Sequence, residues 1–283
     1  MVRGELFRKC VELMGSGSVD DGEFDTLCIF QDATGEKNPM FRPFEEVTAE
    51  QEKIITEFTE KRCSGEPLQY ILGEWEFWGF PVKVGAGVLI PRPDTETLVE
   101  AVLKAVGKTK GEGLEIADLC SGSGCIAIAL KKELPEASVY GVELSETALG
   151  YLRENAGLNG VELHIKRGDV LDKRTASELP LFDVIVSNPP YLTGDDMAEL
   201  QREVAREPSE ALYGGADGLR YYREMTKIWK GSLKKGGILC YEFGMGQHDD
   251  IKKILQENGF GEMKFDRDAG GIIRTVTAKK LST

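Results

Sequence analysis

The chain has 283 residues, of which 41% are hydrophobic and 29% charged, and its formal net charge is −13. This length suits one large or two smaller domains. The acidic balance disfavours direct binding to nucleic acid, because proteins that bind duplexes carry a basic face toward the phosphates. No apolar run is long enough for a membrane span and the N-terminus lacks a signal-peptide core, so we expect a cytoplasmic protein without membrane contact.

The cysteines and histidines indicate neither disulfides nor a metal centre. The six cysteines form no C-x-x-C pair and show no zinc-binding spacing, and there are only two histidines. Free thiols in a reducing compartment are the expected state. A histidine-based triad or a metal site is not expected.

Residues 1–74 have the pattern of a small helical domain. Apolar residues recur at helical spacing over residues 4–14, and further helices are expected over 21–30 and 48–62. The last of these opens with Thr48-Ala49-Glu50-Gln51, the pattern of a capping box. The domain contains no cluster of catalytic side chains. It either recognises a substrate or partner, or simply covers the main domain.

Residues 75–93 are expected to form a β-hairpin linker. Aromatic and polar residues alternate there as in a half-buried hairpin. Pro91 and Pro93 then make the chain rigid and extended, and a helix is expected over residues 96–106. The stretch around the two prolines is either a wall of an active site or a plain connection.

Three strand ends in succession then carry residues suited to binding a nucleotide. A strand over residues 114–119 leads through a glycine-rich turn, 120–124, into a helix, which is typical of nucleotide-binding α/β folds. The strand over 137–142 ends at Glu143, a carboxylate able to accept ribose hydroxyls. The strand over 161–166 is followed by Asp169 and Val170, which suit an adenine ring and its amino group.

The glycine turn alone does not decide between two kinds of ligand. Gly122-Ser123-Gly124-Cys125-Ile126-Ala127 nearly meets the G-x-G-x-x-G pattern of dinucleotide sites, with Ala127 in the third place. S-adenosylmethionine is the alternative. The motif on the next strand favours the latter, because it offers a site for an amide and no evident hydride-transfer machinery.

That motif is Asn188-Pro189-Pro190-Tyr191, directly after an apolar strand over residues 184–186. Prolines cannot continue a strand, so Asn188 is held at the carboxyl end of the sheet, where open α/β sheets bind ligands. The Asn188 Oδ1 and the Pro189 carbonyl can each accept one N–H of a flat NH2 group, while Tyr191 and Leu89 restrain its plane. A rigid proline turn without function is the alternative.

The remaining chain completes a mostly parallel sheet. We expect helices over residues 199–206, 219–233 and 247–258, and strands over 238–243, 261–266 and 272–278. The last two strands are joined by a short glycine-rich loop, so they are antiparallel to each other. One antiparallel strand in a parallel sheet favours a Rossmann-like class I methyltransferase, here over residues 94–283.

These motifs resemble the release factor glutamine methyltransferases, the PrmC/HemK family. The resemblance rests on the segments 65–70, 90–96, 118–124, 188–191 and 212–219. The turn reads Cys-Ser-Gly-Ser-Gly where many relatives have Gly-Thr-Gly-Ser-Gly, and residues 20–43 match poorly. Asn-Pro-Pro-Tyr is shared with DNA adenine and rRNA guanine methyltransferases, so it indicates only the chemistry.

The resemblance implies an enzyme that uses S-adenosylmethionine to methylate the glutamine of the Gly-Gly-Gln motif in peptide chain release factors, and we expect it to act as a monomer. It implies a group of residues that bind the methyl donor: Asp118, Cys120, Ser121, Gly122, Ser123, Gly124, Glu143, Asp169, Val170 and Asn188. It implies a second group that binds the glutamine, of which the first three are also catalytic: Asn188, Pro189, Tyr191, Pro190 and Leu89.

Two other functions fit the same residues. An enzyme that methylates amino groups of DNA or rRNA would share Asn188 to Tyr191 and would bind its substrate with a steep dependence on salt. A non-catalytic module that binds an adenosine ligand and recruits a partner would bind the donor and transfer nothing.

Overall fold

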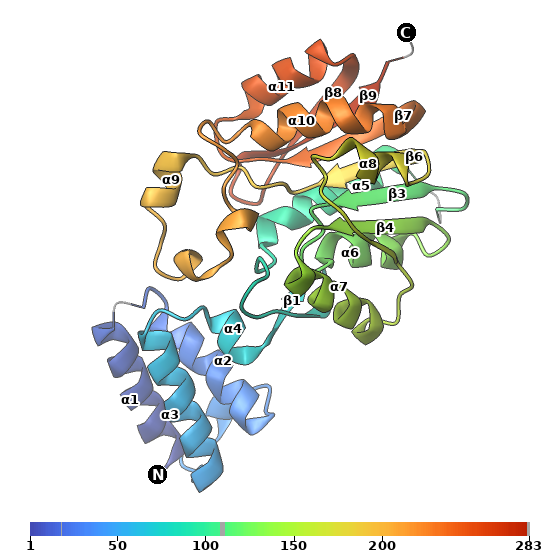
Figure 1. Ribbon diagram of the computed structural model, residues 1–283. Coiled ribbons are helices and arrows are strands. Elements are labelled where there is room, and N and C mark those ends of the chain that lie inside the picture. The colour runs from blue at the N-terminus through green and yellow to red at the C-terminus, as the bar shows by residue number, and fades with distance from the viewer. Residues whose placement is uncertain (18, 108–110, 282–283) are drawn as a thin grey trace. The chain divides into compact units, whose positions relative to one another are not determined.

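A computed structural model describes residues 1–17, 19–107 and 111–281 of the chain (Figure 1). The described chain divides into two compact units. The first comprises residues 1–74 together with 201–206, and the second comprises 75–200 together with 207–283. Nothing in the sequence pattern indicated that residues 201–206 belong to the first unit. Among the described residues, no helix is both long enough and apolar enough to cross a membrane.

The first unit is built on three helices, α1 (Arg3–Ser16), α2 (Gly22–Thr34) and α3 (Ala49–Cys63), joined by η1 (Pro39–Phe41) and followed by the short α4 (Leu68–Leu72). The capping box at the start of α3 is present, since Thr48 and Gln51 each bond the other's backbone N–H. The core consists of apolar side chains from all three helices: Leu6, Cys10, Met14, Ile29, Phe30 and Ile55.

A charge network inside the first unit explains why residues 201–206 belong to it. The Arg62 guanidinium donates to Asp25 at 2.5 Å and to Glu203 at 2.7 Å. Both Arg62 and Asp25 are buried, so each charge must be compensated by the other. The expected helix over 199–206 is wrong: α9 (Gly194–Ala198) ends before this stretch, and only the short η3 (Val204–Arg206) forms within it. The ion pair between Glu203 and Arg62 fixes the path of the stretch instead.

The second unit contains a seven-stranded sheet in the order β5-β4-β3-β6-β7-β9-β8. The bounds of its strands are β3 (Glu115–Leu119), β4 (Ser138–Glu143), β5 (His164–Arg167), β6 (Phe182–Ser187), β7 (Leu233–Glu242), β8 (Phe260–Arg267) and β9 (Ile273–Lys280). Only β9 runs antiparallel to its neighbours. The expected Rossmann-like sheet with one antiparallel strand, beside a helical N-terminal region, is therefore confirmed.

Two helical layers cover this sheet. One consists of α5 (Glu96–Val106), α6 (Cys125–Glu133) and α7 (Glu146–Leu158), and the other of α8 (Lys173–Ser177), α10 (Arg220–Trp229) and α11 (His248–Glu257), as Figure 1 shows. Short 3-10 turns, η2 (Pro93–Thr95), η4 (Ser209–Ala211) and η5 (Lys230–Ser232), join these elements. The arrangement places the carboxyl ends of β3, β4, β5 and β6 at one edge, where α/β sheets bind ligands.

Strand β7 begins five residues earlier than the sequence indicated. Gly236 and Gly237 lie inside the strand, although such a pair usually marks a loop. Gly236 has a φ of 73°, and the pairing with β6 shifts register between Phe182 and Val184. The glycines therefore form a bulge that bends the strand without ending it.

The expected hairpin forms from β1 (Glu74–Phe77) and β2 (Phe80–Lys83). Trp78 and Gly79 both have positive φ, 54° and 73°, as a two-residue hairpin turn requires. The Trp78 backbone N–H donates to Glu96 and its indole N–H to Glu133, both at 2.8 Å. The turn is thereby held against the start of α5 and the end of α6.

We predict that Arg62→Ala destabilises the first unit selectively. Removing the guanidinium leaves Asp25 buried without its partner, which costs about 3 kcal/mol. All three tryptophans lie in the second unit, so tryptophan fluorescence reports that unit while far-UV circular dichroism reports the helices of both. The dichroism transition in urea should move to lower denaturant, ahead of the fluorescence transition.

The matched control is Arg42→Ala, whose ion pair with Glu45 is exposed on both sides. This variant should unfold like the wild type, because exposed pairs contribute little. Coincident transitions in Arg62→Ala, at the wild-type midpoint, would contradict the importance of the network.

Candidate active site

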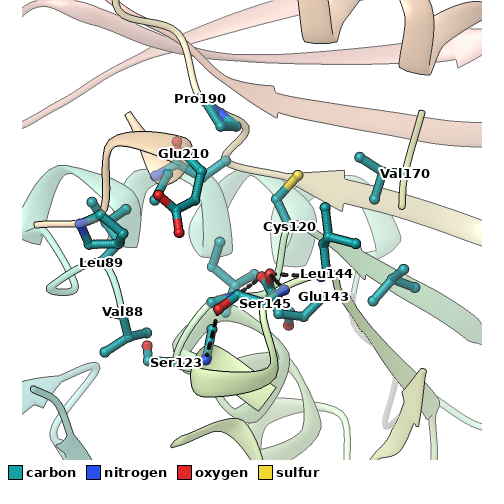
Figure 2. A pocket seen from close by; sticks show the side chains of 18 of the residues that line it. Val88, Leu89, Cys120, Ser123, Glu143, Leu144, Ser145, Val170, Pro190 and Glu210 are labelled. Carbon is teal, nitrogen blue, oxygen red and sulfur yellow. Dashed lines mark hydrogen bonds between the residues drawn. The ribbon is translucent and has the colours of Figure 1, made fainter. Parts of the chain in front are cut away.

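A cavity of about 260 Å³ lies at the carboxyl edge of the sheet in the second unit (Figure 2). Its walls come from the ends of β3, β4 and β6, from the loop after β5, and from two connecting stretches around residues 87–95 and 208–211. The side chains that face it are mostly apolar, with a few carboxyl, hydroxyl and amide groups among them. Such a lining is typical of small-molecule sites.

The structure brings most of the residues singled out in the sequence to this wall. Those on the wall are Leu89, Cys120, Ser121, Gly122, Ser123, Glu143, Asp169, Val170, Asn188 and Pro190. Four others do not line it: Asp118, Gly124, Pro189 and Tyr191. Sequence reasoning offered the stretch around Pro91 and Pro93, with Arg92 and Thr95, as a possible wall, but it missed Leu144, Ser145, Glu210 and Tyr221. Of these four, only Leu144 and Ser145 had a signal, because they directly follow a strand-end acid.

The glycine turn after β3 brings backbone close to the cavity. Gly122 and Gly124 have φ values of 55° and 84°, in the left-handed region that favours glycine. A Cβ on Gly124 would lie 2.2 Å from Leu152 of α7, so this residue allows the helices to pack closely. Asn155 of α7 donates to the Ser123 carbonyl at 2.9 Å and exchanges bonds with the backbone of β2. The turn is therefore rigid and tied to the hairpin.

Cys120 stands in a conformation that suits glycine better. Its φ is 59°, which costs a non-glycine residue roughly 1 kcal/mol. Burial raises the pKa of its thiol well above the ordinary value, so the thiol stays protonated and is a poor nucleophile. Cys120 acts in the wall as a small apolar group.

Asp118 lies beneath the turn and is fully buried. The Ser121 hydroxyl donates to its Oδ2 at 2.5 Å, while Oδ1 has no hydrogen-bond partner among the described residues. Burial raises the pKa of Asp118 to about 7, and the bond from Ser121 opposes that rise. Asp118 therefore positions the turn and does not face the cavity.

The carboxylates at the ends of β4 and β5 are oriented by backbone N–H groups. Glu143 accepts from Gly122 at 2.8 Å, Leu144 at 2.7 Å and Ser145 at 2.8 Å. Asp169 accepts from Leu171 at 2.8 Å through one oxygen. The carbonyl of the buried Val170 accepts from the Trp229 indole at 2.8 Å. Figure 2 shows Glu143 and Val170 on the same side of the cavity, separated from Leu89.

Asn188 directly follows strand β6 and lies on a part of the wall away from Glu143 and Val170. The Ser187 hydroxyl donates to the Leu119 carbonyl at 2.5 Å, which fastens the end of β6 to β3. The Asn188 Nδ2 donates to the Thr95 hydroxyl at 3.2 Å. Since Nδ2 is directed at Thr95, the Oδ1 of the amide is the atom left to accept a bond from a ligand.

A glycine-rich loop holds the two prolines and Tyr191 from behind. A Cβ on Gly214 would lie 2.6 Å from the Tyr191 Cα, and one on Gly218 would lie 2.3 Å from the Tyr191 carbonyl oxygen. The Gln247 amide donates to the same carbonyl at 3.0 Å. Burial raises the pKa of Tyr191 to about 12, and its ring packs against the core. The loop over residues 211–219 is thus a brace for the motif.

The stretch around Pro91 and Pro93 proves to be a wall of the cavity. Leu89, Pro91, Arg92 and Thr95 all line it. The buried Glu207 accepts from the Ile90 backbone N–H at 3.0 Å and from the Arg92 guanidinium. One carboxylate thus ties the returning loop to this wall.

The lining suits a small ligand that carries hydroxyl and amino groups. Carboxylates at the ends of β4 and β5 are acceptors for hydroxyl and amino groups, and apolar side chains of Leu144, Val170 and Tyr221 surround the space between them. The glycine turn leaves backbone accessible beside Asn188. Among the described residues, no group of three or more His, Cys, Asp or Glu side chains is placed to hold a metal ion.

The fold and this site define a methyltransferase domain of the class I type. Residues 93–216 match the family model described as the methyltransferase small domain. The solved T. thermophilus 16S rRNA N2 G1207 methyltransferase, described as a complex with AdoMet and guanosine, is similar in fold: TM-score 0.52, 20% identity, covering 73% of this chain and 49% of that one.

Relatives that align with most of the chain indicate a more specific family. Residues 5–73 match the PrmC N-terminal domain. The release factor glutamine methyltransferase of Thermodesulfovibrio yellowstonii is 39% identical over 246 residues, covering 87% of this chain and 88% of the relative. That of Fusobacterium nucleatum is 39% identical over 281 residues, covering 98% of this chain and 78% of the relative. The chain belongs to the release factor glutamine methyltransferase family.

We predict that Asp118→Asn changes how stability depends on pH. The folded-state pKa of about 7 lies above the ordinary 3.8, so the unfolded state loses its proton first and the wild type loses stability as pH rises between these values. The asparagine side chain does not titrate in this range, so the variant lacks this loss of stability. Relative to the wild type, the variant should gain on the order of 2 kcal/mol between about pH 5 and about pH 8.

Urea unfolding followed by tryptophan fluorescence at the two pH values measures this gain. Asp195→Asn, an exposed acid on α9, is the control and should track the wild type at both. An equal difference between Asp118→Asn and the wild type at both pH values would contradict the raised pKa.

Proposed function

We propose that the protein transfers a methyl group from S-adenosylmethionine to the side-chain amide nitrogen of the glutamine in the Gly-Gly-Gln motif of peptide chain release factors, as a cytoplasmic monomer. One observation carries the proposal: Asn188 is oriented so that its Oδ1 is available at the same cavity as the glycine turn. Family membership over nearly the whole chain supports the choice of substrate.

Binding of the donor is assigned to the residues around the glycine turn and the strand-end acids. Backbone at residues 120–124 would lie against the methionine part, Glu143 against the ribose, and Asp169 with Val170 against the adenine. The donor supplies a methyl group activated by a positively charged sulfur. Asp118 acts indirectly, because it holds Ser121 from below the wall.

Binding of the glutamine is assigned to Asn188 and its neighbours. A carboxamide nitrogen is a poor nucleophile because its lone pair is delocalised into the carbonyl. Two acceptors would take its two N–H bonds and aim the nitrogen at the methyl group: the Asn188 Oδ1 on the wall, and the carbonyl of Pro189, which lies between the wall residues Asn188 and Pro190. They also stabilise the positive charge that develops on nitrogen. Leu89 and Pro190 on the wall, with Tyr191 behind them, would restrict the plane of the amide.

No strong base is needed in this scheme. The nitrogen becomes acidic once it is alkylated, so water or a carbonyl oxygen can accept its proton. The thiol of Cys120 does not serve, because its pKa is raised well above the ordinary value.

The substrate is tested by incubating the protein with methyl-labelled S-adenosylmethionine and three acceptors in parallel. These are a purified release factor, the same factor with its Gly-Gly-Gln glutamine replaced by alanine, and total RNA. Label should enter only the unaltered factor. Label in RNA would favour a nucleic-acid methyltransferase, and donor binding without transfer to any acceptor would favour a binding module.

We predict that Asn188→Ala lowers kcat by about 10²-fold or more, the scale for removing one oriented hydrogen bond at a developing charge. Affinity for S-adenosylmethionine, measured by calorimetry, should change little, because Glu143 and Asp169, which are assigned to its ribose and adenine, are unaltered in this variant. Near-normal turnover in this variant would disprove the role assigned to Asn188.

A further inference from the structure

The side chain of Asn188 is oriented by two buried residues behind it, Thr95 and Glu242. Glu242 ends β7, and it follows Tyr241, which pairs with Ser187 of β6. Asn188 and Glu242 therefore emerge side by side from neighbouring strands. Thr95 ends η2 and is 3% exposed, and Glu242 is 2% exposed.

The Thr95 hydroxyl contacts Asn188 and does not cap a helix. It stands at the position before α5, where threonine commonly caps, yet it makes no side-chain cap bond. Its oxygen accepts from the Asn188 Nδ2 at 3.2 Å. Thr95 and Asn188 both lie close enough to the Glu242 carboxyl group to lower its pKa, Thr95 more strongly. The hydroxyl therefore lies between the amide and the acid.

The Glu242 carboxyl group has few other polar partners. Its Oε2 has no hydrogen-bond partner among the described residues. Burial raises its pKa to about 7, which the bond from Thr95 and the charge of Arg274 oppose and the charge of Asp94 reinforces. The Tyr222 hydroxyl donates to its backbone carbonyl at 2.8 Å and fixes the end of β7. A buried acid in this position is costly to stability, which indicates a role in the site.

The consequence is a fixed polarity for the Asn188 amide. If the amide were turned over, Oδ1 would lie beside the Glu242 carboxylate, which repels it, and the Thr95 hydroxyl could donate to only one of these two oxygens. Nδ2 would then face the cavity. With Thr95 and Glu242 in place, the cavity receives an acceptor. An acceptor binds the NH2 of a carboxamide and repels the oxygen of a carboxylate.

We propose that Thr95 and Glu242 are positioning residues that make the enzyme select glutamine over glutamate. They act through the orientation of Asn188, although Thr95 also lines the cavity. This inference rests on the proposed function, because it assumes that the acceptor is a glutamine side chain.

The experiment compares wild type, Thr95→Val, Thr95→Ser and Glu242→Gln on a release factor. It measures kcat and KM, and also the direct binding of the same factor with glutamate in place of the Gly-Gly-Gln glutamine. Valine keeps the shape of threonine without the hydroxyl. Serine keeps the hydroxyl, and Glu242→Gln removes the charge that opposes a turned-over Asn188.

Thr95→Val should lower kcat about 10- to 100-fold, the scale for a misaligned reacting group. It should also tighten binding of the glutamate-containing factor by about 10-fold relative to the glutamine form, because Nδ2 can then face the cavity. Glu242→Gln should act in the same direction, and Thr95→Ser should restore both values to within a few-fold of wild type.

The matched control is Thr277→Val, a buried threonine on β9 whose hydroxyl contacts only the Cys240 thiol among the described residues. It should behave as wild type. Wild-type kcat and discrimination in Thr95→Val would overturn the inference, as would equal losses in Thr95→Ser or Thr277→Val. Absence of methylation by the wild type itself would instead overturn the proposed function, so the two failures are distinct.

Discussion

The site depends on one constraint: Asn188 is placed at the end of a central strand and prevented from moving. Two prolines end β6 immediately after it, because they cannot extend the ladder. Thr95 fixes its Nδ2, and Ser187 ties the strand end to β3. Behind the prolines, Gly214 and Gly218 approach the backbone of Tyr191 more closely than any side chain would allow. The rigidity comes from several elements, so no single contact has to supply it.

This arrangement is costly to the stability of the folded chain. Asp118 and Glu242 are both buried with pKa values of about 7, and each has one carboxyl oxygen without a partner among the described residues. Cys120 occupies a left-handed conformation. Three such features occur around one cavity. Elsewhere in the sheet, Glu115 and Thr275 also have a buried side-chain oxygen without a partner among the described residues, and Glu262 has a positive φ. Concentration of strain and buried charge at a site is expected where function, not stability, selects the residues.

Much of the fold could be predicted because it depends on local pattern. The periodicity of α5, the alternation in the hairpin and the apolar runs of β3 and β6 are all visible within a few residues. The helix expected over 199–206 failed for a reason outside any local window. Glu203 pairs with Arg62, more than a hundred positions away, and that long-range contact decides the path. The bulge at Gly236 likewise depends on the partner strand.

The residues of the candidate site divide in the same way, into those that a local pattern indicates and those that depend on long-range contacts. Wall residues at strand ends, such as Glu143 and Asn188, could be recognised from their position after an apolar run. Thr95 and Glu242 could not, because each looks ordinary in its own segment: a threonine before a helix and an acid at a strand end. Glu242 comes beside Asn188 only when β6 and β7 pair, and Thr95 only when η2 packs against the same strand end.

Selectivity must therefore lie in details that the fold does not specify. A solved 16S rRNA methyltransferase has a similar fold, so topology alone cannot distinguish an amide from a base amino group. Both groups offer NH2 to an asparagine oxygen. What distinguishes them is the surroundings: a chain with a net charge of −13 repels a phosphate backbone but not a protein loop. In the proposed function, the Asn188 oxygen defines the chemistry, and the net charge of the chain favours a protein as the molecule that presents the amide.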